Sequence, residues 1–273
     1  LPWFAITALM HSVMVLERRN TLYAWVIILC LLTFILSVTG TFLVRSGILN
    51  SVHTFASDPS RGIYILFFLS LMIFTSLISF FKKCKKESYN LNLKSRETFI
   101  LANNWFMAFF LVTVLIGTLY PIFLDVIMDV KISVGPPFYN IVIVPLIVPF
   151  IILMTVGPQF KWINSQNIKF HKTIFIFFGA VIINLFIYYF FGSYSILTNL
   201  IFIVAIFLIL QCFLDAKKSL YKNQKFEYPR IISHLGFGLL VLCIGINHQY
   251  SLEVDFNLKV GENKKVNNYE IYF

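Results

Sequence analysis

The sequence predicts an all-α polytopic membrane protein with about eight transmembrane helices, followed by the beginning of a small outward-facing β domain. Hydrophobic residues fill 59% of the 273 positions and charged residues only 12%, whereas an average soluble domain has about 25% charged residues. A soluble protein this apolar would lack the polar surface needed to cover itself. The exterior is therefore expected to face lipid.

The transmembrane prediction rests on apolar runs whose lengths are close to the roughly 20 residues that span a bilayer. The runs are approximately residues 1–16, 23–45, 62–81, 100–123, 140–158, 173–191, 197–215 and 231–247. Residues 135–137 (Gly-Pro-Pro) predict a non-helical turn before the fifth run, in which Pro145 and Pro149 predict a kink. Residues 1–248 are thus expected to form one helical bundle.

The basic residues predict the orientation of the bundle. Most of the 22 Lys and Arg residues lie in alternate loops, at residues 17–22, 82–98, 159–172 and 216–230. Such loops face the cytoplasm in membrane proteins. The net charge of +10 is spread over topogenic clusters and not gathered on one domain, which argues against a nucleic-acid-binding protein. The intervening loops and the C-terminal tail are expected outside.

Residues 249–273 change from helical to strand-like periodicity. Apolar and polar residues alternate from Leu252 to Val260, which predicts a strand with one buried face. Residues 261–263 have turn chemistry, and a second strand is expected from Val266 to Phe273. The tail is therefore interpreted as the opening of an outward-facing β domain.

Two histidines within apolar runs are candidate cofactor ligands. His11 lies six residues before Glu17 and His234 four residues after Arg230. These spacings place them roughly 9 and 6 Å from the basic ends of their helices, at about 1.5 Å per residue. Imidazoles at similar depth on two helices can bind one haem iron, with the second ring nitrogen bonded to a helix carbonyl. The alternative is two independent histidines, each hydrogen-bonded within its own helix.

The outward loop SGILNSVHTFASDPSR contains a third candidate, His53, which suits a haem presented at the outer face. The alternative interpretation of His53 is an ordinary solvated loop histidine. Arg45, at the end of the second run, is either a snorkelling charge or a partner of a haem propionate. His171, between basic residues, and His248, just past the last run, are interpreted as solvated and interfacial side chains.

Several long motifs, in order, resemble one known family. They include PWFAITALMHSVMVLERRN, GTFLVRSGILNSVHTFASDPSRGIYIL, KISVGPPFYN and ISHLGFGLLVLCIG. Together they resemble the CcmF/NrfE family of cytochrome c-type biogenesis haem lyases. The resemblance implies that His11 and His234 are the axial ligands of a buried b-type haem. It also implies that His53 is a catalytic ligand of the haem being delivered.

The resemblance further implies a holocytochrome c synthase in the bacterial inner membrane, preferred over the mitochondrial one, with a periplasmic C-terminal tail. Such an enzyme attaches haem to the CxxCH thiols of apocytochrome c. Its implied partners are apocytochrome c, a haem chaperone and thiol-handling membrane subunits. The family's Trp-rich haem-handling loop would precede Leu1 and is missing. We therefore expect a C-terminal fragment or a split subunit, with a separate chain carrying that loop.

Two other functions are open to a chain of this composition: a haem transporter or exporter, and a non-catalytic scaffold of the maturation complex. Charged residues along a midplane path would favour a transporter. The apolar runs here contain almost no Asp, Glu, Lys or Arg away from their ends. This composition argues against ion-coupled transport.

Overall fold

Helices make up most of the structure, a computed structural model that describes residues 1–46, 59–83, 92–163, 170–192, 195–221, 227–251, 257–266 and 269–272. The elements are α1 (Pro2–Arg19), α2 (Tyr23–Arg45), α3 (Pro59–Lys83), α4 (Arg96–Met128), α5 (Pro136–Val142), α6 (Val144–Val156), the short 3₁₀ helix η1 (Gly157–Gln159), α7 (Phe170–Phe191), α8 (Ile196–Tyr221), α9 (Tyr228–Tyr250), β1 (Asn263–Val266) and β2 (Tyr269–Tyr272).

Each predicted apolar run coincides with a helix or with the bent pair α5–α6, so the helical class is confirmed. Within the described residues, six helices are long and apolar enough to cross a membrane: α2, α3, α4, α7, α8 and α9. The bent pair makes a seventh span if it is counted as one. The remaining predicted run, residues 1–16, corresponds to α1, whose last turn carries Glu17, Arg18 and Arg19.

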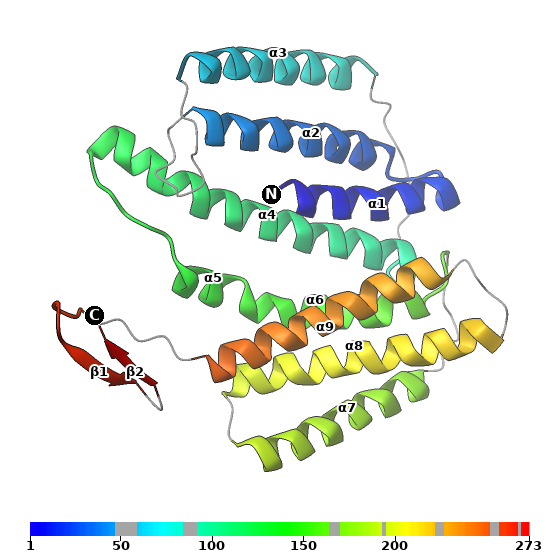
Figure 1. Ribbon diagram of the computed structural model, residues 1–273. Coiled ribbons are helices and arrows are strands. Elements are labelled where there is room, and N and C mark those ends of the chain that lie inside the picture. The colour runs from blue at the N-terminus through cyan, green and yellow to red at the C-terminus, as the bar shows by residue number, and fades with distance from the viewer. Residues whose placement is uncertain are drawn as a thin grey trace.

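The helices lie side by side in a broad layer (Figure 1). α1 packs between α2 and α4, and α3 packs on the outer side of α2. α6 connects α4 to α8, and α8 also contacts α7 and α9. The C-terminal ends of α1 and α8 and the N-terminal ends of α4 and α9 lie at one end of this layer (Figure 1). We call this the basic end, because it carries Arg18, Arg19, Arg96 and Arg230.

The outermost helices expose large apolar side chains. On α3, Phe67 and Phe81 are 71% and 77% exposed, and on α7, Phe175 is 80% exposed. Such surfaces would be unstable in water at this extent. Together with the candidate spans they describe a multi-pass membrane protein, as the composition predicts.

α8 is the most buried helix of the layer. Ala205 and Leu208 of α8 join Phe150 of α6 and Val241 of α9 in the main apolar cluster. α9 approaches α8 closely at glycines: a Cβ on Gly245 would lie 2.5 Å from Cε1 of Phe202. Small residues at helix contacts are typical of membrane bundles, because they let backbones approach closely.

Proline residues explain the break in the fifth predicted run. Gly135 is the N-cap of α5, and Pro136 and Pro137 occupy its first turn, where a missing N–H is tolerated. The chain bends by 49° between α5 and the segment Val144–Gln159, directly before Pro145. The kink is confirmed. The expected non-helical turn is wrong at Pro136, because the helix begins there.

The tail forms a hairpin whose strands begin and end at other residues than predicted. β1 pairs with β2 in antiparallel fashion, Asn263 opposite Tyr272 and Val266 opposite Tyr269. A turn is present at Gly261, where φ is +89° and the N–H of Glu262 donates to Lys259 O. The predicted first strand is wrong for residues 257–260, which contain no strand, and its residues 252–256 lie outside the described residues. β1 begins at Asn263, within the predicted turn, and the predicted second strand, residues 266–273, contains the whole of β2.

Candidate functional site

His11 lies on α1, two turns before the basic end, and its ring orientation is fixed locally. Nδ1 of His11 lies 2.8 Å from the carbonyl oxygen of Thr7, one helical turn earlier. A carbonyl can only accept a hydrogen bond, so Nδ1 carries the proton and donates it. The Nε2 lone pair is therefore left to bind a metal, which is the arrangement usual for metal-ligating imidazoles.

His234 lies on α9, one turn after Arg230, and is half-buried like His11. The two imidazoles are close enough to interact electrostatically. However, neither helix is a main packing partner of the other: α1 packs on α2 and α4, and α9 packs on α8. The structure thus places two candidate ligands from distant parts of the sequence within electrostatic range of each other, on helices that are not main packing partners.

A buried polar contact adjoins His11. The next residue, Ser12, donates to Ala8 O at 2.9 Å and accepts from Nδ2 of Asn104, on α4, at 2.7 Å. Ser12 and Asn104 are almost completely buried. Oδ1 of Asn104 has no hydrogen-bond partner among the described residues. This bond fixes α1 relative to α4 at the level of His11.

An ionic network lies beside His234 at the basic end. Nη1 of Arg230 contacts Oδ2 of Asp215, on α8, at 3.1 Å, and its Nε contacts Oε2 of Glu227 at 2.8 Å. The same Asp215 carboxylate accepts hydrogen bonds from the side-chain amides of Gln211, at 2.9 Å, and Gln159, at 3.2 Å. These bonds join α8, α9 and η1 and hold Arg230 in place.

A second network joins α1 to the start of α4. Glu97, almost fully buried, accepts from Nε of Arg19 at 3.4 Å and from the hydroxyl of Thr21 at 2.6 Å. Its neighbour Arg96 is the first residue of α4, and the preceding Ser95 caps the helix by accepting from the N–H of Thr98. The guanidinium of Arg96 lies over the ring of Trp162, 5.2 Å from its centroid.

Of the remaining predicted residues, those that the structure describes are not brought to this site. His53 and its loop lie outside the described residues, so its role stays a prediction. His171 and His248 are exposed, and Arg45 is exposed at the end of α2 that lies away from the basic end. The described residues contain no group of three or more His, Cys, Asp and Glu that could hold a metal ion.

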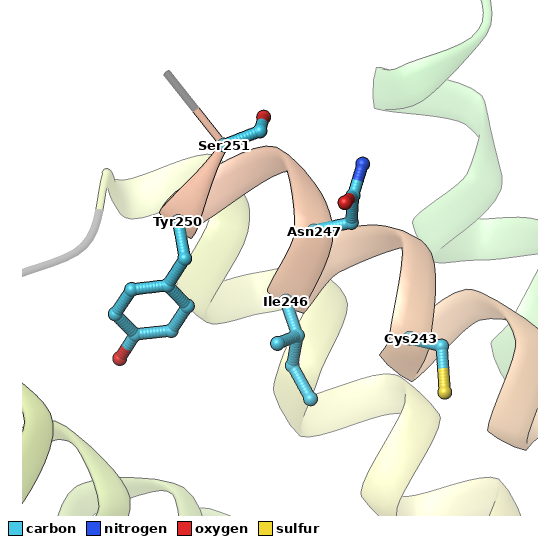
Figure 2. Close-up of a pocket in the computed structure, with 5 residues that line it drawn as sticks. All are labelled: Cys243, Ile246, Asn247, Tyr250 and Ser251. Atoms are coloured by element: carbon cyan, nitrogen blue, oxygen red, sulfur yellow. The ribbon is translucent and has the colours of Figure 1, made fainter. Parts of the chain in front are cut away.

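A shallow groove of about 350 Å³ runs along the last turns of α9 (Figure 2). It is lined by Cys243, Ile246, Asn247, Tyr250 and Ser251. These residues follow His234 along the chain toward the C-terminal end of α9, the nearest of them, Cys243, more than two helical turns away. The groove is thus separate from the paired histidines.

Comparison with known proteins decides the family. No protein-family model matches the sequence. The cytochrome c-type biogenesis protein CcmF of Escherichia coli (strain K12) is 35% identical over 280 residues, which cover 100% of this chain and 43% of that protein. This chain belongs to the CcmF family. CcmF of Haemophilus influenzae is 34% identical over 288 residues, and NrfE of the same organism is 26% identical over 284.

The CcmF fold is confirmed by a solved structure. The chain matches a structure titled cytochrome c haem lyase CcmF with a TM-score of 0.72 and 20% identity, covering 98% of this chain and 41% of that one. At this identity the likeness concerns the fold alone. The chain spans less than half the length of the curated CcmF proteins that it matches.

In this CcmF-family chain, sequence reasoning missed Arg96 and Asp215 as candidate site residues at the basic end. Both lie at the boundary of an apolar run, where a charge is ordinarily a topogenic or interfacial residue. One signal was available: Asp215 is an acid placed among apolar residues at the end of the seventh run, where an unpaired carboxylate would be costly.

Proposed function

We propose that this chain is part of a cytochrome c haem lyase that attaches haem to the CxxCH thiols of apocytochrome c at the outer face of the membrane. The observation that carries the proposal is the proximity of His11 and His234, with Nε2 of His11 left free by the Thr7 hydrogen bond. The relatives named as cytochrome c-type biogenesis proteins support the same function.

The chemistry of the two residues fits a b-type haem. Two neutral imidazoles are a normal axial ligand pair for haem iron, and the porphyrin supplies the other four nitrogens. Bound there, the haem would supply one-electron redox chemistry. Within the protein, Thr7 fixes the ring of His11, while apolar neighbours such as Ala8 and Leu235 exclude water. Exclusion of water and the hydrogen bonds of the ligands are what tune a haem potential.

The covalent step would take place at a second, outward-facing haem, the substrate. We propose His53 as an axial ligand that holds its iron while the apocytochrome thiols react. Each thiol S–H adds across a vinyl C=C bond: sulfur bonds one carbon and hydrogen ends on the other. This addition needs no oxidant. The histidine of the CxxCH motif then replaces His53, or the ligand opposite it, when the product is released.

The proposed setting is the bacterial inner membrane, with the basic loops in the cytoplasm and the tail in the periplasm. The basic end of the described helices supports this orientation, because Lys and Arg accumulate on the cytoplasmic side. In this setting the partners are apocytochrome c, a haem chaperone, thiol-handling membrane subunits and a chain that carries the Trp-rich loop. Residues 249–273 would open a periplasmic domain.

The haem content of histidine variants tests the proposed site. We expect His11→Ala and His234→Ala each to abolish stoichiometric b-haem in the purified chain, because each removes one axial bond. His171→Ala and His248→Ala are matched controls, since both side chains are exposed away from the pair. Wild-type haem content in the double variant lacking His11 and His234 would defeat the proposal. Thioether formation in a reconstituted system separates a lyase from a transporter or a scaffold.

A further inference from the structure

We propose that Arg96 binds a propionate carboxylate of the haem held between His11 and His234. The inference rests on the proposed function, because it concerns the same cofactor. It adds a residue outside the ligand pair, on α4, a helix that carries neither histidine. It also fixes the direction of the cofactor: the carboxylate edge of the porphyrin would point toward the basic end.

Arg96 is placed near the proposed iron ligands. Two arginines, Arg230 and Arg96, lie within electrostatic range of the His234 imidazole. Arg96 begins α4, its backbone N–H donates to Lys161 O at 2.9 Å, and its guanidinium lies over Trp162. These contacts limit the positions open to the side chain. A half-buried, positioned guanidinium binds an anion more strongly than one that moves freely in water.

Arg230 is the less suitable of the two arginines. Its Nε already contacts Glu227 and its Nη1 contacts Asp215, so both sides of its planar fork have carboxylate partners. Arg96, in contrast, makes no ion pair and no side-chain hydrogen bond with any described residue, and its guanidinium lies over the ring of Trp162. The donors of Arg96 are therefore available, and those of Arg230 are largely used.

The balance of charge also favours an anionic ligand. Arg96 interacts electrostatically with Arg230, and the nearby carboxylates Glu227 and Asp215 are both engaged by Arg230. The same two carboxylates also interact with Arg96, and Arg18 lies within the same range, so three arginines face two carboxylates and one positive charge is in excess. A propionate would supply the missing charge, and the Arg fork matches the geometry of a carboxylate, with two parallel N–H···O bonds.

The test compares haem with haem dimethyl ester, in which both carboxylates are blocked, by titration into the purified 273-residue chain in detergent. We expect the wild type to bind haem about tenfold to a hundredfold more tightly than the ester, the usual range for one charge-assisted hydrogen-bonded contact. Arg96→Gln should bind haem as weakly as the ester, and Arg96→Lys should keep part of the preference. Lys172→Gln, which removes an exposed charge at the start of α7, should leave the preference unchanged.

The outcomes separate this inference from the proposed function. If Arg96→Gln keeps the preference for haem over the ester, the inference is wrong while the histidine site stands. If Arg96→Gln weakens haem and ester equally, the residue has only a structural role and the inference is again wrong. If the wild type binds haem but its absorption spectrum is the same as that of variants lacking His11 and His234, the proposed function itself fails.

Discussion

The Asp215–Arg230 ion pair is predicted to be the most important polar contact between α8 and α9. Asp215 is 9% exposed and accepts from Arg230, Gln211 and Gln159. The substitution Asp215→Ala would leave Arg230 with Glu227 alone and would deprive both amides of their acceptor. It would also release the arginine that stands one turn before His234.

The burial of the two side chains determines how much stability the Asp215→Ala variant is expected to lose. Removing one partner of a buried ion pair costs about 3–5 kcal/mol, because the other charge stays buried without compensation. The side chain of Arg230 is 23% exposed, so water screens part of that penalty. We therefore expect Asp215→Ala to lower the free energy of unfolding by roughly 3 kcal/mol, at the low end of that range.

The assay is reversible unfolding in mixed micelles with an increasing fraction of denaturing detergent. Glu227→Ala is the matched control, because Glu227 also contacts Arg230 but lies three residues away on the same chain segment and is 33% exposed. An exposed pair of this kind contributes at most about 1 kcal/mol. If Asp215→Ala costs no more than Glu227→Ala, the reasoning that this pair joins α8 to α9 is refuted.

Two further predictions concern helix contacts, and both are measured by the same unfolding assay. Gly245→Ala should destabilise the chain by about 1–3 kcal/mol relative to Gly236→Ala. The new Cβ at position 245 would collide with Phe202, whereas a Cβ at Gly236 meets nothing within 4 Å. Equal stability of the two variants would contradict the close α8–α9 packing. Asn104→Leu should cost only about 0.5–1.5 kcal/mol, since it removes one hydrogen bond and Ser12 keeps its bond to Ala8 O. A loss well above that range would show that the free Oδ1 of Asn104 has a partner outside the described residues.

The helical layer could be predicted from the sequence because lipid imposes a simple rule. A span needs about 20 apolar residues, and seven of the eight predicted runs correspond to a candidate span or to the bent pair. The bend before Pro145 followed from proline chemistry as well. The register of the tail could not be predicted, because apolar and polar residues alternate from Leu252 onward and several registers fit a short, exposed hairpin.

The candidate site could be predicted only in part. The depth of His11 and His234 follows from helix geometry, and the Thr7 bond follows from the four-residue helical repeat. Their proximity depends on how eight helices are arranged, which no local pattern specifies. Arg96 lies within electrostatic range of the Asp215–Arg230 pair because the ends of α4, α8 and α9 lie at the same end of the layer. No local pattern specifies this, so the charge of Arg96 could not be distinguished from an ordinary loop charge.

The claim that His11 and His234 hold one haem iron is tested most directly by the spin state of the iron in the purified chain. The wild type should give a low-spin, six-coordinate spectrum, because two imidazoles occupy both axial positions. His234→Gly should give a high-spin, five-coordinate spectrum that added imidazole returns to low spin. A low-spin spectrum in His234→Gly without imidazole, or a high-spin wild type, would contradict the claim.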